Sequence, residues 1–387
     1  MKKPVLWLVL FLFLVNFASP LLAQENWEKA FAFIVAVDMR EYATEPYRTS
    51  QHFWGACEAI KKVGKGAFMV SPGDIDPPHA VREVISLVLG ADYPWYPVVG
   101  NHELESTSHL DYLREYNKDG ESLPNIIRKG PQGCEETTYS FEWDNCHFVV
   151  LNQYYDGKSD TGTDGDIVPE LLAWLEEDLA ANTKKHVFVF GHEPIIAVPD
   201  MDNGRIRHQG DSLDKYSKNS FRFHQLLLKY GVTAYICGHT HNTSFCKING
   251  LWQIDAGHAR GIEGKPAPEQ LFEALTRASQ EGKKRSLGEQ QAIAEYYETQ
   301  KKNIDRWLTS MALTGKPVVQ TLSQFYLDYQ QGGEAKEKYF QAFWENSGYA
   351  RSTFLKIYAG KEEVKVEIYR DDGRGGIYSL RHTEILD

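Results

Sequence analysis

Cysteine is scarce in this chain of 387 residues, which has only five. An odd number cannot all pair, and none of them has the spacing of a zinc finger. In an exported protein, bridges between Cys134 and Cys146 and between Cys237 and Cys246 would be plausible, leaving Cys57 over. Buried free thiols are an equally good interpretation of each pair. The cysteines thus exclude a zinc finger and leave the disulfides open.

Positively charged residues are also few: the chain has 42 Lys and Arg against 53 Asp and Glu, which gives a net charge of −11. Loss of residues 1–23, which hold two lysines and no acid, would change this to −13. Such a chain is a poor non-specific binder of nucleic acid or of anionic membranes, which argues against a nuclease. Any phosphate it binds needs concentrated local positive charge, which metal ions supply.

Long apolar runs are missing except at the start of the chain. Met1-Lys2-Lys3 precedes an apolar stretch from Val5 to Phe17 and the small residues up to Ala23. This pattern predicts a signal peptide over 1–23 and a secreted or periplasmic protein with no membrane association after cleavage. The alternative is an uncleaved anchor, although the stretch is shorter than the ~20 residues that a span needs.

The rest of the chain divides by composition. Residues 24–262 alternate apolar runs with glycine and polar loops, which predicts the main domain. Residues 263–347 are rich in Ala, Glu, Gln and Lys with helical periodicity, which predicts a helical insertion or subdomain. Residues 348–387 alternate again, which predicts β-strands that return to the main domain. The sequence shows no solenoid-type repeats and gives no signal for the oligomeric state.

Five short apolar runs in the main domain each end in a polar side chain, usually after a glycine. The endings are Asp38, Gly73-Asp74, Gly100-Asn101-His102-Glu103, Gly191-His192 and Gly238-His239-Thr240-His241. Parallel strands present a site at their C-terminal ends in this way. We therefore expect the five endings to converge on one site.

Periodicity assigns the segments between these endings. Strands are predicted at 31–38, 67–70, 97–99, 187–190, 232–237, 251–254, 354–358, 364–369 and 377–380, and helices at 50–65, 81–89, 107–117, 169–182 and 221–229. Residues 137–141 and 147–151 should form a hairpin that turns at Asp144-Asn145. Three prolines predict a shaped loop over 71–79, and the polar residues 198–219 predict a loop over the site.

Asp, Asn and His are oxygen and nitrogen donors that suit Zn, Mn or Fe ions, and a carboxylate such as Asp74 can bridge two of them. Two ions roughly 3.5–4 Å apart bind a phosphoryl group, activate a water and stabilise the leaving oxygen. The donor types therefore point to metal-assisted hydrolysis of phosphate esters.

In order and spacing these endings resemble the motifs of the calcineurin-like metallophosphoesterases, in particular the secreted members similar to purple acid phosphatases. The resemblance covers residues 31 to about 258. It implies an α/β fold with two stacked mixed β-sheets, flanking helices and the metals at one end. It also implies ligand sets: Asp74, Asn101, His192 and His239 for one ion, and Asp38, Asp74, His241 and a histidine two residues after Asp38 for the other.

That last histidine is absent, since Arg40 stands in its place. Arginine stays protonated and cannot ligate a cation. Either the ion is held by fewer ligands, with Asp76, His79 or water filling in, or only one ion binds tightly. Arg40 would then clamp a substrate phosphate as a catalytic residue, or form an ion pair with Asp38 or Asp76.

The resemblance implies that His102 protonates the leaving oxygen or stabilises the transition state; an orienting hydrogen bond is its alternative role. A partner carboxylate often lies three residues after the Asp74 position, where this chain has Pro77. Glu103 and Glu193 are interpreted as supporting groups rather than catalysts.

Substrate contacts are predicted for Arg40, His102, His258 and Arg205, the last in a phosphate-facing loop that also contains Arg207 and His208. Plain loop residues are the alternative for His258 and for this loop.

These features predict an exported metal-dependent phosphoesterase that hydrolyses phosphomonoesters or small phosphodiesters by attack of a metal-bound hydroxide. The cofactors would be two divalent or trivalent ions, or a single tightly bound one, and the partner a small phosphorylated substrate. The alternative is a phosphate-binding or ligand-binding protein in which Arg40 has degraded the first metal site.

Overall fold

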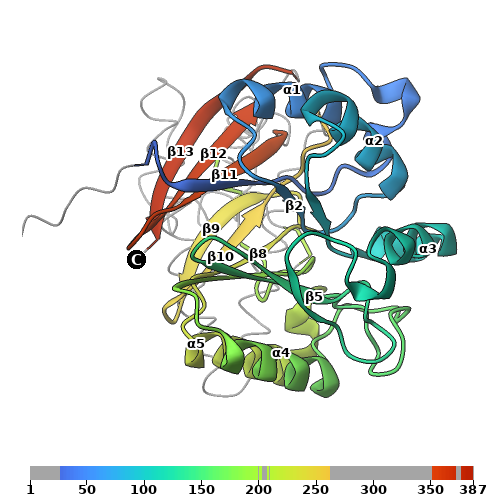
Figure 1. Ribbon diagram of the computed structural model, residues 1–387, viewed down its shortest axis with the longest axis vertical. Coiled ribbons are helices and arrows are strands. Elements are labelled where there is room, and N and C mark those ends of the chain that lie inside the picture. The colour runs from blue at the N-terminus through green and yellow to red at the C-terminus, as the bar shows by residue number, and fades with distance from the viewer. Residues whose placement is uncertain are drawn as a thin grey trace, which may run out of the picture.

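The computed structural model describes residues 27–198, 200–202, 207–208, 210–261, 351–371 and 376–386. In this part of the chain, two β-sheets pack face to face and helices cover both outer faces (Figure 1). The predicted signal peptide, the predicted insertion at 263–347 and Arg205 lie outside the described residues.

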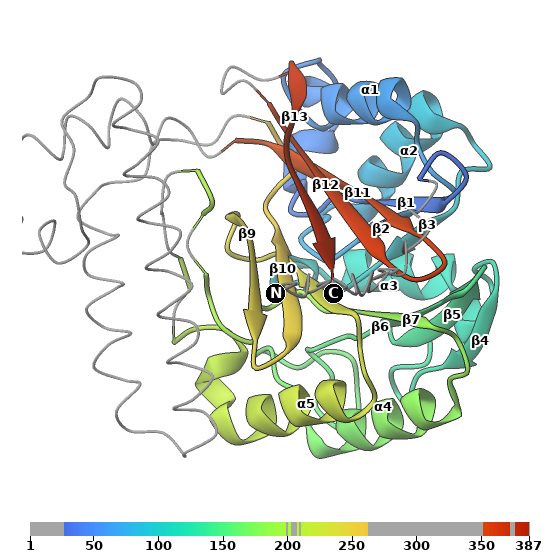
Figure 2. The same ribbon diagram turned by 90° about the vertical axis from the view of Figure 1, so that its left-hand side faces the viewer.

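The first sheet has six strands in the order β13-β12-β11-β1-β2-β3. Their bounds are β1 (Phe31–Val35), β2 (Met69–Ser71), β3 (Trp95–Pro97), β11 (Thr353–Ala359), β12 (Val364–Asp371) and β13 (Tyr378–Leu386). β1, β2 and β3 are parallel, whereas β11 pairs antiparallel with β1 and continues into the β12–β13 hairpin (Figure 2). The C-terminal strands β11, β12 and β13 therefore form half of the first sheet.

The second sheet has seven strands in the order β4-β5-β6-β7-β8-β10-β9. Their bounds are β4 (Ile126–Lys129), β5 (Tyr139–Trp143), β6 (Cys146–Val150), β7 (His186–Phe190), β8 (Ala234–Cys237), β9 (Thr243–Ile248) and β10 (Leu251–Ala256). β6, β7, β8 and β10 are parallel neighbours, and β4, β5 and β9 are antiparallel. The predicted hairpin is β5–β6, while β4 and β9 had not been predicted.

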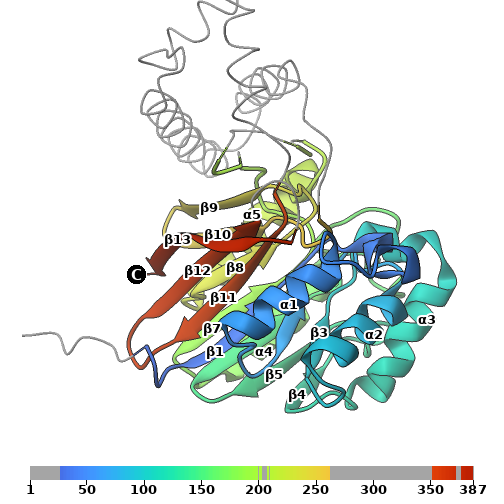
Figure 3. The same cartoon turned by 90° about the horizontal axis from the view of Figure 1, so that it is seen from above.

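Three helices, α1 (Phe53–Val63), α2 (Pro78–Leu89) and α3 (Thr107–Tyr116), lie on the side of the first sheet, and Figure 3 shows α1 and α2 in front of its strands. On the side of the second sheet lie α4 (Pro169–Ala181) and α5 (Ser217–Lys229) (Figure 1). Short 3-10 helices span Arg40–Ala43, Glu45–Tyr47, Asn101–Glu105, Lys118–Gly120 and Leu213–Tyr216.

The predicted loops at 71–79 and 198–219 are both too long. α2 already begins at Pro78, because proline lacks only an N–H that the first helical turn leaves unpaired. The 3-10 helix at 213–216 and the first turn of α5 take up the end of the second loop. The third strand, predicted at 97–99, spans 95–97 instead.

Both faces of β1 are buried. Phe33, Val35 and Val37 enter the core between the sheets, while Ile34 and Ala36 pack beneath the helices. Aromatic rings dominate the inter-sheet core, with the ring centroid of Phe33 5.2 Å from that of Phe148. A strand covered on both faces shows a continuous apolar run, which is why these strands could be recognised from the sequence.

All five cysteines are buried and none of them forms a disulfide, so the thiol alternative holds for both candidate pairs. Among the described residues, we find no helix with the length and hydrophobicity needed to span a bilayer.

Candidate metal centre

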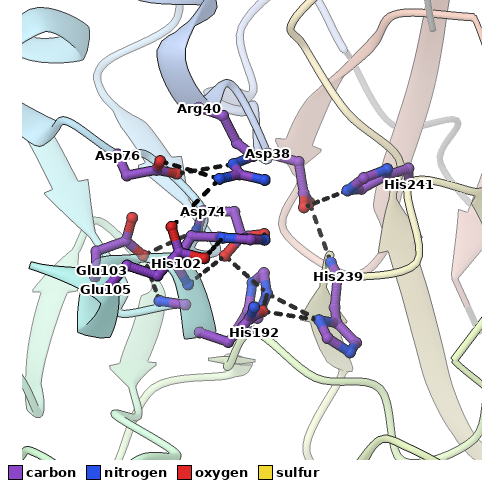
Figure 4. Close-up of polar contacts among 12 residues, drawn as sticks. Asp38, Arg40, Asp74, Asp76, His102, Glu103, Glu105, His192, His239 and His241 are labelled. Atoms are coloured by element: carbon purple, nitrogen blue, oxygen red, sulfur yellow. Dashed lines mark hydrogen bonds and ion pairs between the residues drawn. The ribbon is translucent and has the colours of Figure 1, made fainter.

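The topology gathers the five predicted endings at one end of the sandwich. The chain passes from β1, β2 and β3 of one sheet, and from β7 and β8 of the other, directly into the loops that hold them. The structure brings together all six predicted metal ligands. Figure 4 labels Asp38, Asp74, His192, His239 and His241, and Asn101 lies against His192 and His239. We call Asp74, Asn101, His192 and His239 the Asn101 side, and Asp38, His241, Arg40, Arg207 and Arg260 the Asp38 side.

Ligand atoms on the Asn101 side lie close together. Nε2 of His192 is 3.1 Å from Oδ1 of Asn101 and 3.2 Å from Oδ1 of Asp74. Nδ1 of His239 is 3.1 Å from the same Asn101 oxygen and 3.2 Å from Nε2 of His192. A buried group of Asp38, Asp74 and His192 also has its ligand atoms within 4.8 Å of one another.

The hydrogens on this side can be assigned at His192. Its Nδ1 lies 2.8 Å from the carbonyl oxygen of Pro72, which can only accept, so Nδ1 carries the hydrogen. Burial lowers the pKa of His192, which keeps the ring neutral and leaves a lone pair on Nε2. That lone pair faces two more acceptors, Asn101 Oδ1 and Asp74 Oδ1, with no hydrogen between them. A bound cation would turn this repulsion into coordination, so the donor set fits a metal ion.

Left-handed backbone conformations cluster at the centre. Asp38, Arg40, Asp74, His239 and His241 have φ values of 55°, 48°, 50°, 69° and 57°. Residues other than glycine rarely adopt this region, and each such residue stores strain that the surrounding structure must offset. The fold thus holds these side chains in positions that the local sequence alone would not choose.

The glycines of the motifs are required by close approach. A Cβ on Gly73, which has φ of 91°, would lie 2.4 Å from Nδ1 of His192. A Cβ on Gly238 would lie 2.4 Å from Oδ2 of Asp38. Neither position has room for a side chain while the ligands keep their places.

Glu103 connects two of the ligand loops. Its buried carboxylate accepts backbone N–H groups from Gly100 at 2.5 Å, Asp74 at 3.0 Å and Ile75 at 2.8 Å. Glu193 accepts the hydroxyl of Tyr154 at 2.8 Å, and burial raises its pKa to about 8. These contacts are those of supporting groups.

The Asp38 side has a different chemistry. Oδ2 of Asp38 accepts the backbone N–H of His239 at 3.1 Å, and Nε2 of His241 lies 3.3 Å from Oδ1 of Asp38. The other ring nitrogen of His241, Nδ1, accepts from Nη2 of Arg260 at 2.7 Å and from Nη1 of Arg207. Arg260 had not been predicted, since it lies beyond the last ligand motif.

Arg40 forms ion pairs across the same side. Its Nε is 3.3 Å from Oδ1 of Asp76, and its Nη2 is 3.5 Å from Oδ2 of Asp76 and 3.6 Å from Glu105. Of the two carboxylates considered as its partner, the structure shows Asp76. A role in clamping phosphate stays a prediction.

His102 has a carboxylate partner that the sequence had not revealed. Its Nδ1 lies 2.6 Å from Oε1 of Glu105, and its Nε2 faces Asp74 Oδ2 at 3.6 Å. The 3-10 helix at 101–105 puts residues three apart on one face, so Glu105 takes the place that Pro77 cannot fill. Spacing within this short turn was the signal available in the sequence.

Comparison with known proteins places the chain in a family. A sequence profile of the calcineurin-like phosphoesterases matches residues 47–243, about half of the chain. The chain belongs to this family. The two-sheet sandwich with flanking helices is the metallophosphatase fold, and the buried group of Asp38, Asp74 and His192 agrees with a family that binds metal ions.

Relatives of this family member are distant. Tartrate-resistant acid phosphatase type 5 of Oryctolagus cuniculus is 26% identical over 171 residues, which cover 42% of the chain and 48% of the phosphatase. The enzyme of the same name from Rattus norvegicus is 36% identical over 87 residues, covering 22% and 23%. The chain therefore spans about half the length or less of these curated relatives. A solved structure of PhoD is similar in fold alone, with a TM-score of 0.52, 12% identity and coverage of 92% of this chain and 69% of PhoD.

The remaining predicted residues lie at the edges of the centre. His258 is fully buried, with its ring centroid 5.9 Å from that of His241. In the predicted loop over the site, the ring of His208 lies 4.1 Å from that of His239. His79 contacts the ring of Tyr112 at 6.2 Å. Substrate contact by His258 stays untested.

Proposed function

We propose that this family member is a metal-dependent phosphoesterase that hydrolyses phosphomonoesters or small phosphodiesters. The observation that carries the proposal is the convergence of His192 Nε2, Asn101 Oδ1 and Asp74 Oδ1 with no hydrogen between them. Similarity to acid phosphatases supports the same chemistry.

The Asn101 side would hold the ion through Asp74, Asn101, His192 and His239. A bound metal supplies Lewis acidity toward a phosphoryl oxygen and lowers the pKa of water. The hydrogen bond from Nδ1 of His102 to Glu105 holds the ring with Nε2 toward Asp74. From there, protonated His102 would deliver a proton from Nε2 to the leaving oxygen.

We also propose that the enzyme acts outside the cytoplasm on small phosphorylated molecules. The N-terminal pattern of a signal peptide supports export, and the net charge of −11 disfavours polyanionic substrates such as nucleic acid.

Hydrolysis of a chromogenic phosphomonoester and a chromogenic phosphodiester tests the proposal, with Mn, Zn or Fe added after chelation. We expect turnover of these substrates, which chelation abolishes and one of these ions restores. The His102→Gln variant should lower the turnover rate about 10²-fold to 10⁴-fold. A second candidate function is phosphate binding without hydrolysis, which the guanidinium groups on the Asp38 side favour. Retained phosphate binding without turnover in any of these ions would select it.

A further inference from the structure

The two sides of the centre differ in where their hydrogens are. On the Asp38 side, His241 Nδ1 lies next to guanidinium groups of Arg260 and Arg207. Guanidinium nitrogens only donate, so Nδ1 must accept and the hydrogen of the neutral ring is on Nε2. Nε2 lies 3.3 Å from Asp38 Oδ1 without a hydrogen bond between them, and with its hydrogen in place it has no lone pair for a cation.

The second potential ligand position on this side is also a donor. Arg40 has five N–H groups and no lone pair for a cation. Its contacts with Asp76 and Glu105 use Nε and Nη2, and its side chain is 26% exposed. Within the described part of the chain these are its carboxylate partners, so Nη1 still has hydrogens to offer. The guanidinium is held in place and partly open to a ligand.

Guanidinium groups of the protein therefore lie close to the carboxylates on this side, while Oδ1 of Asp38 itself has no hydrogen-bond partner among the described residues. Asp38, Asp74 and Asp76 face Arg40 and Arg260, and Arg207 reaches His241 from the loop over the site. A second cation would have Asp38 and the shared Asp74 as anionic ligands, because Asp76 is paired with Arg40. It would have no nitrogen ligand at position 40 or from His241 in this tautomer, and it would meet fixed guanidinium charges nearby. The donor set does not fit a second ion.

We propose that the centre holds one metal ion, on the Asn101 side, and that Arg40 binds a phosphoryl oxygen on the Asp38 side. This inference rests on the proposed function, because it assigns the groups that hold the phosphoryl group. Arginine suits the role, since its planar fork binds phosphate oxygens in pairs and its charge does not depend on pH. His102 and Arg40 share Glu105, which would hold both of them on the phosphoryl group.

Metal content tests the first half of the proposal. The full chain is loaded with Mn²⁺, and bound ions are counted by elemental analysis and by calorimetric titration. We expect one ion per chain, with the electron paramagnetic resonance spectrum of an isolated ion. Two bound ions with a coupled spectrum would overturn the inference, while turnover by the same sample would leave the proposed function intact.

Inorganic phosphate tests the second half, by calorimetry on the Mn²⁺-loaded protein. Arg40→Gln should weaken phosphate binding about tenfold or more and leave the metal content at one ion. Arg40→Lys keeps the charge and the ion pair with Asp76 but loses the planar fork. Its phosphate affinity should therefore lie between those of the wild type and Arg40→Gln. Arg128→Gln is the matched control. Arg128 lies on the edge strand β4, is partly exposed, and forms an ion pair with Glu177.

Folding of each variant is checked by circular dichroism melting. Unchanged phosphate affinity in folded Arg40→Gln and Arg40→Lys would overturn the role of Arg40. Failure of the wild-type protein to bind any ion would instead remove the proposed function itself, so the two failures are distinguishable.

Discussion

The Asn101 side and the Asp38 side are built on equivalent strand ends, yet they solve the same electrostatic problem differently. On the Asn101 side, acceptors face one another and require a cation from outside. On the Asp38 side, the chain supplies its own cations as guanidinium groups. The comparison teaches that the hydrogens on ring nitrogens distinguish a metal site from an ion-pair network, even where the residue types are alike.

Removing one histidine from each side should give the largest contrast. His239→Ala removes a ligand of the proposed ion, so metal content and turnover should both be lost. The loss of metal affinity should exceed the roughly 10-fold to 100-fold that results from removing a residue that only hydrogen-bonds to a ligand. His241→Ala removes a hydrogen-bonded ring and should leave one ion bound. Elemental analysis and phosphatase assays of both variants measure the difference. Equal loss of metal in the two variants would show that the sides are not distinct.

The anchor of the loop over the site should give the next largest effect. Buried Arg370 on β12 donates to Asp200 at 3.0 and 2.9 Å and to Asp202 at 2.9 Å, just before that loop reaches Arg207. Arg370→Met leaves buried carboxylates without this charge, so the free energy of unfolding should fall by about 3–5 kcal/mol. Denaturant unfolding measures it.

Arg381 provides the control for that variant. It also pairs with Asp202, at 2.8 Å, but its side chain is 47% exposed. Arg381→Met should therefore change stability by only about 0–1 kcal/mol. A similar loss in both variants would contradict the importance of burial at Arg370.

Glu105 should give the smallest effect, because it acts through other groups. Glu105→Gln weakens the contact that orients His102, and we expect kcat to fall about 10-fold to 100-fold with one ion still bound. If His102 protonates the leaving oxygen, the fall should be larger for an alkyl phosphate than for p-nitrophenyl phosphate, whose leaving group needs no proton. The same fall for both substrates would argue against that role.

Much of the fold could be predicted because the strands next to the centre are buried on both faces. The apolar runs before Asp38 and His192 have that character, and the glycines before the ligands mark close approaches. β4 and β9 were missed because they lie at the edges of their sheet, where one side of the strand lacks a neighbour and the apolar pattern is weaker.

Within the centre, the residue types could be read from the sequence but the partners could not. Whether Arg40 would pair with Asp38 or Asp76 depends on how two loops are placed, and the sequence left both open. The tautomer of His241 depends on Arg260, which lies in the loop that follows β10. Contacts of this kind arise from tertiary placement, which periodicity does not report.

The pairing of β1 with β11 has a consequence for biosynthesis. Phe31, near the start of the described chain, lies opposite Ala359, near its end. The strand that leads to Asp38 therefore lacks its antiparallel neighbour until residues 353–359 have left the ribosome. Nascent chains that stop short of residue 353 would expose this edge of β1, and the centre would mature only after β11 has been synthesised.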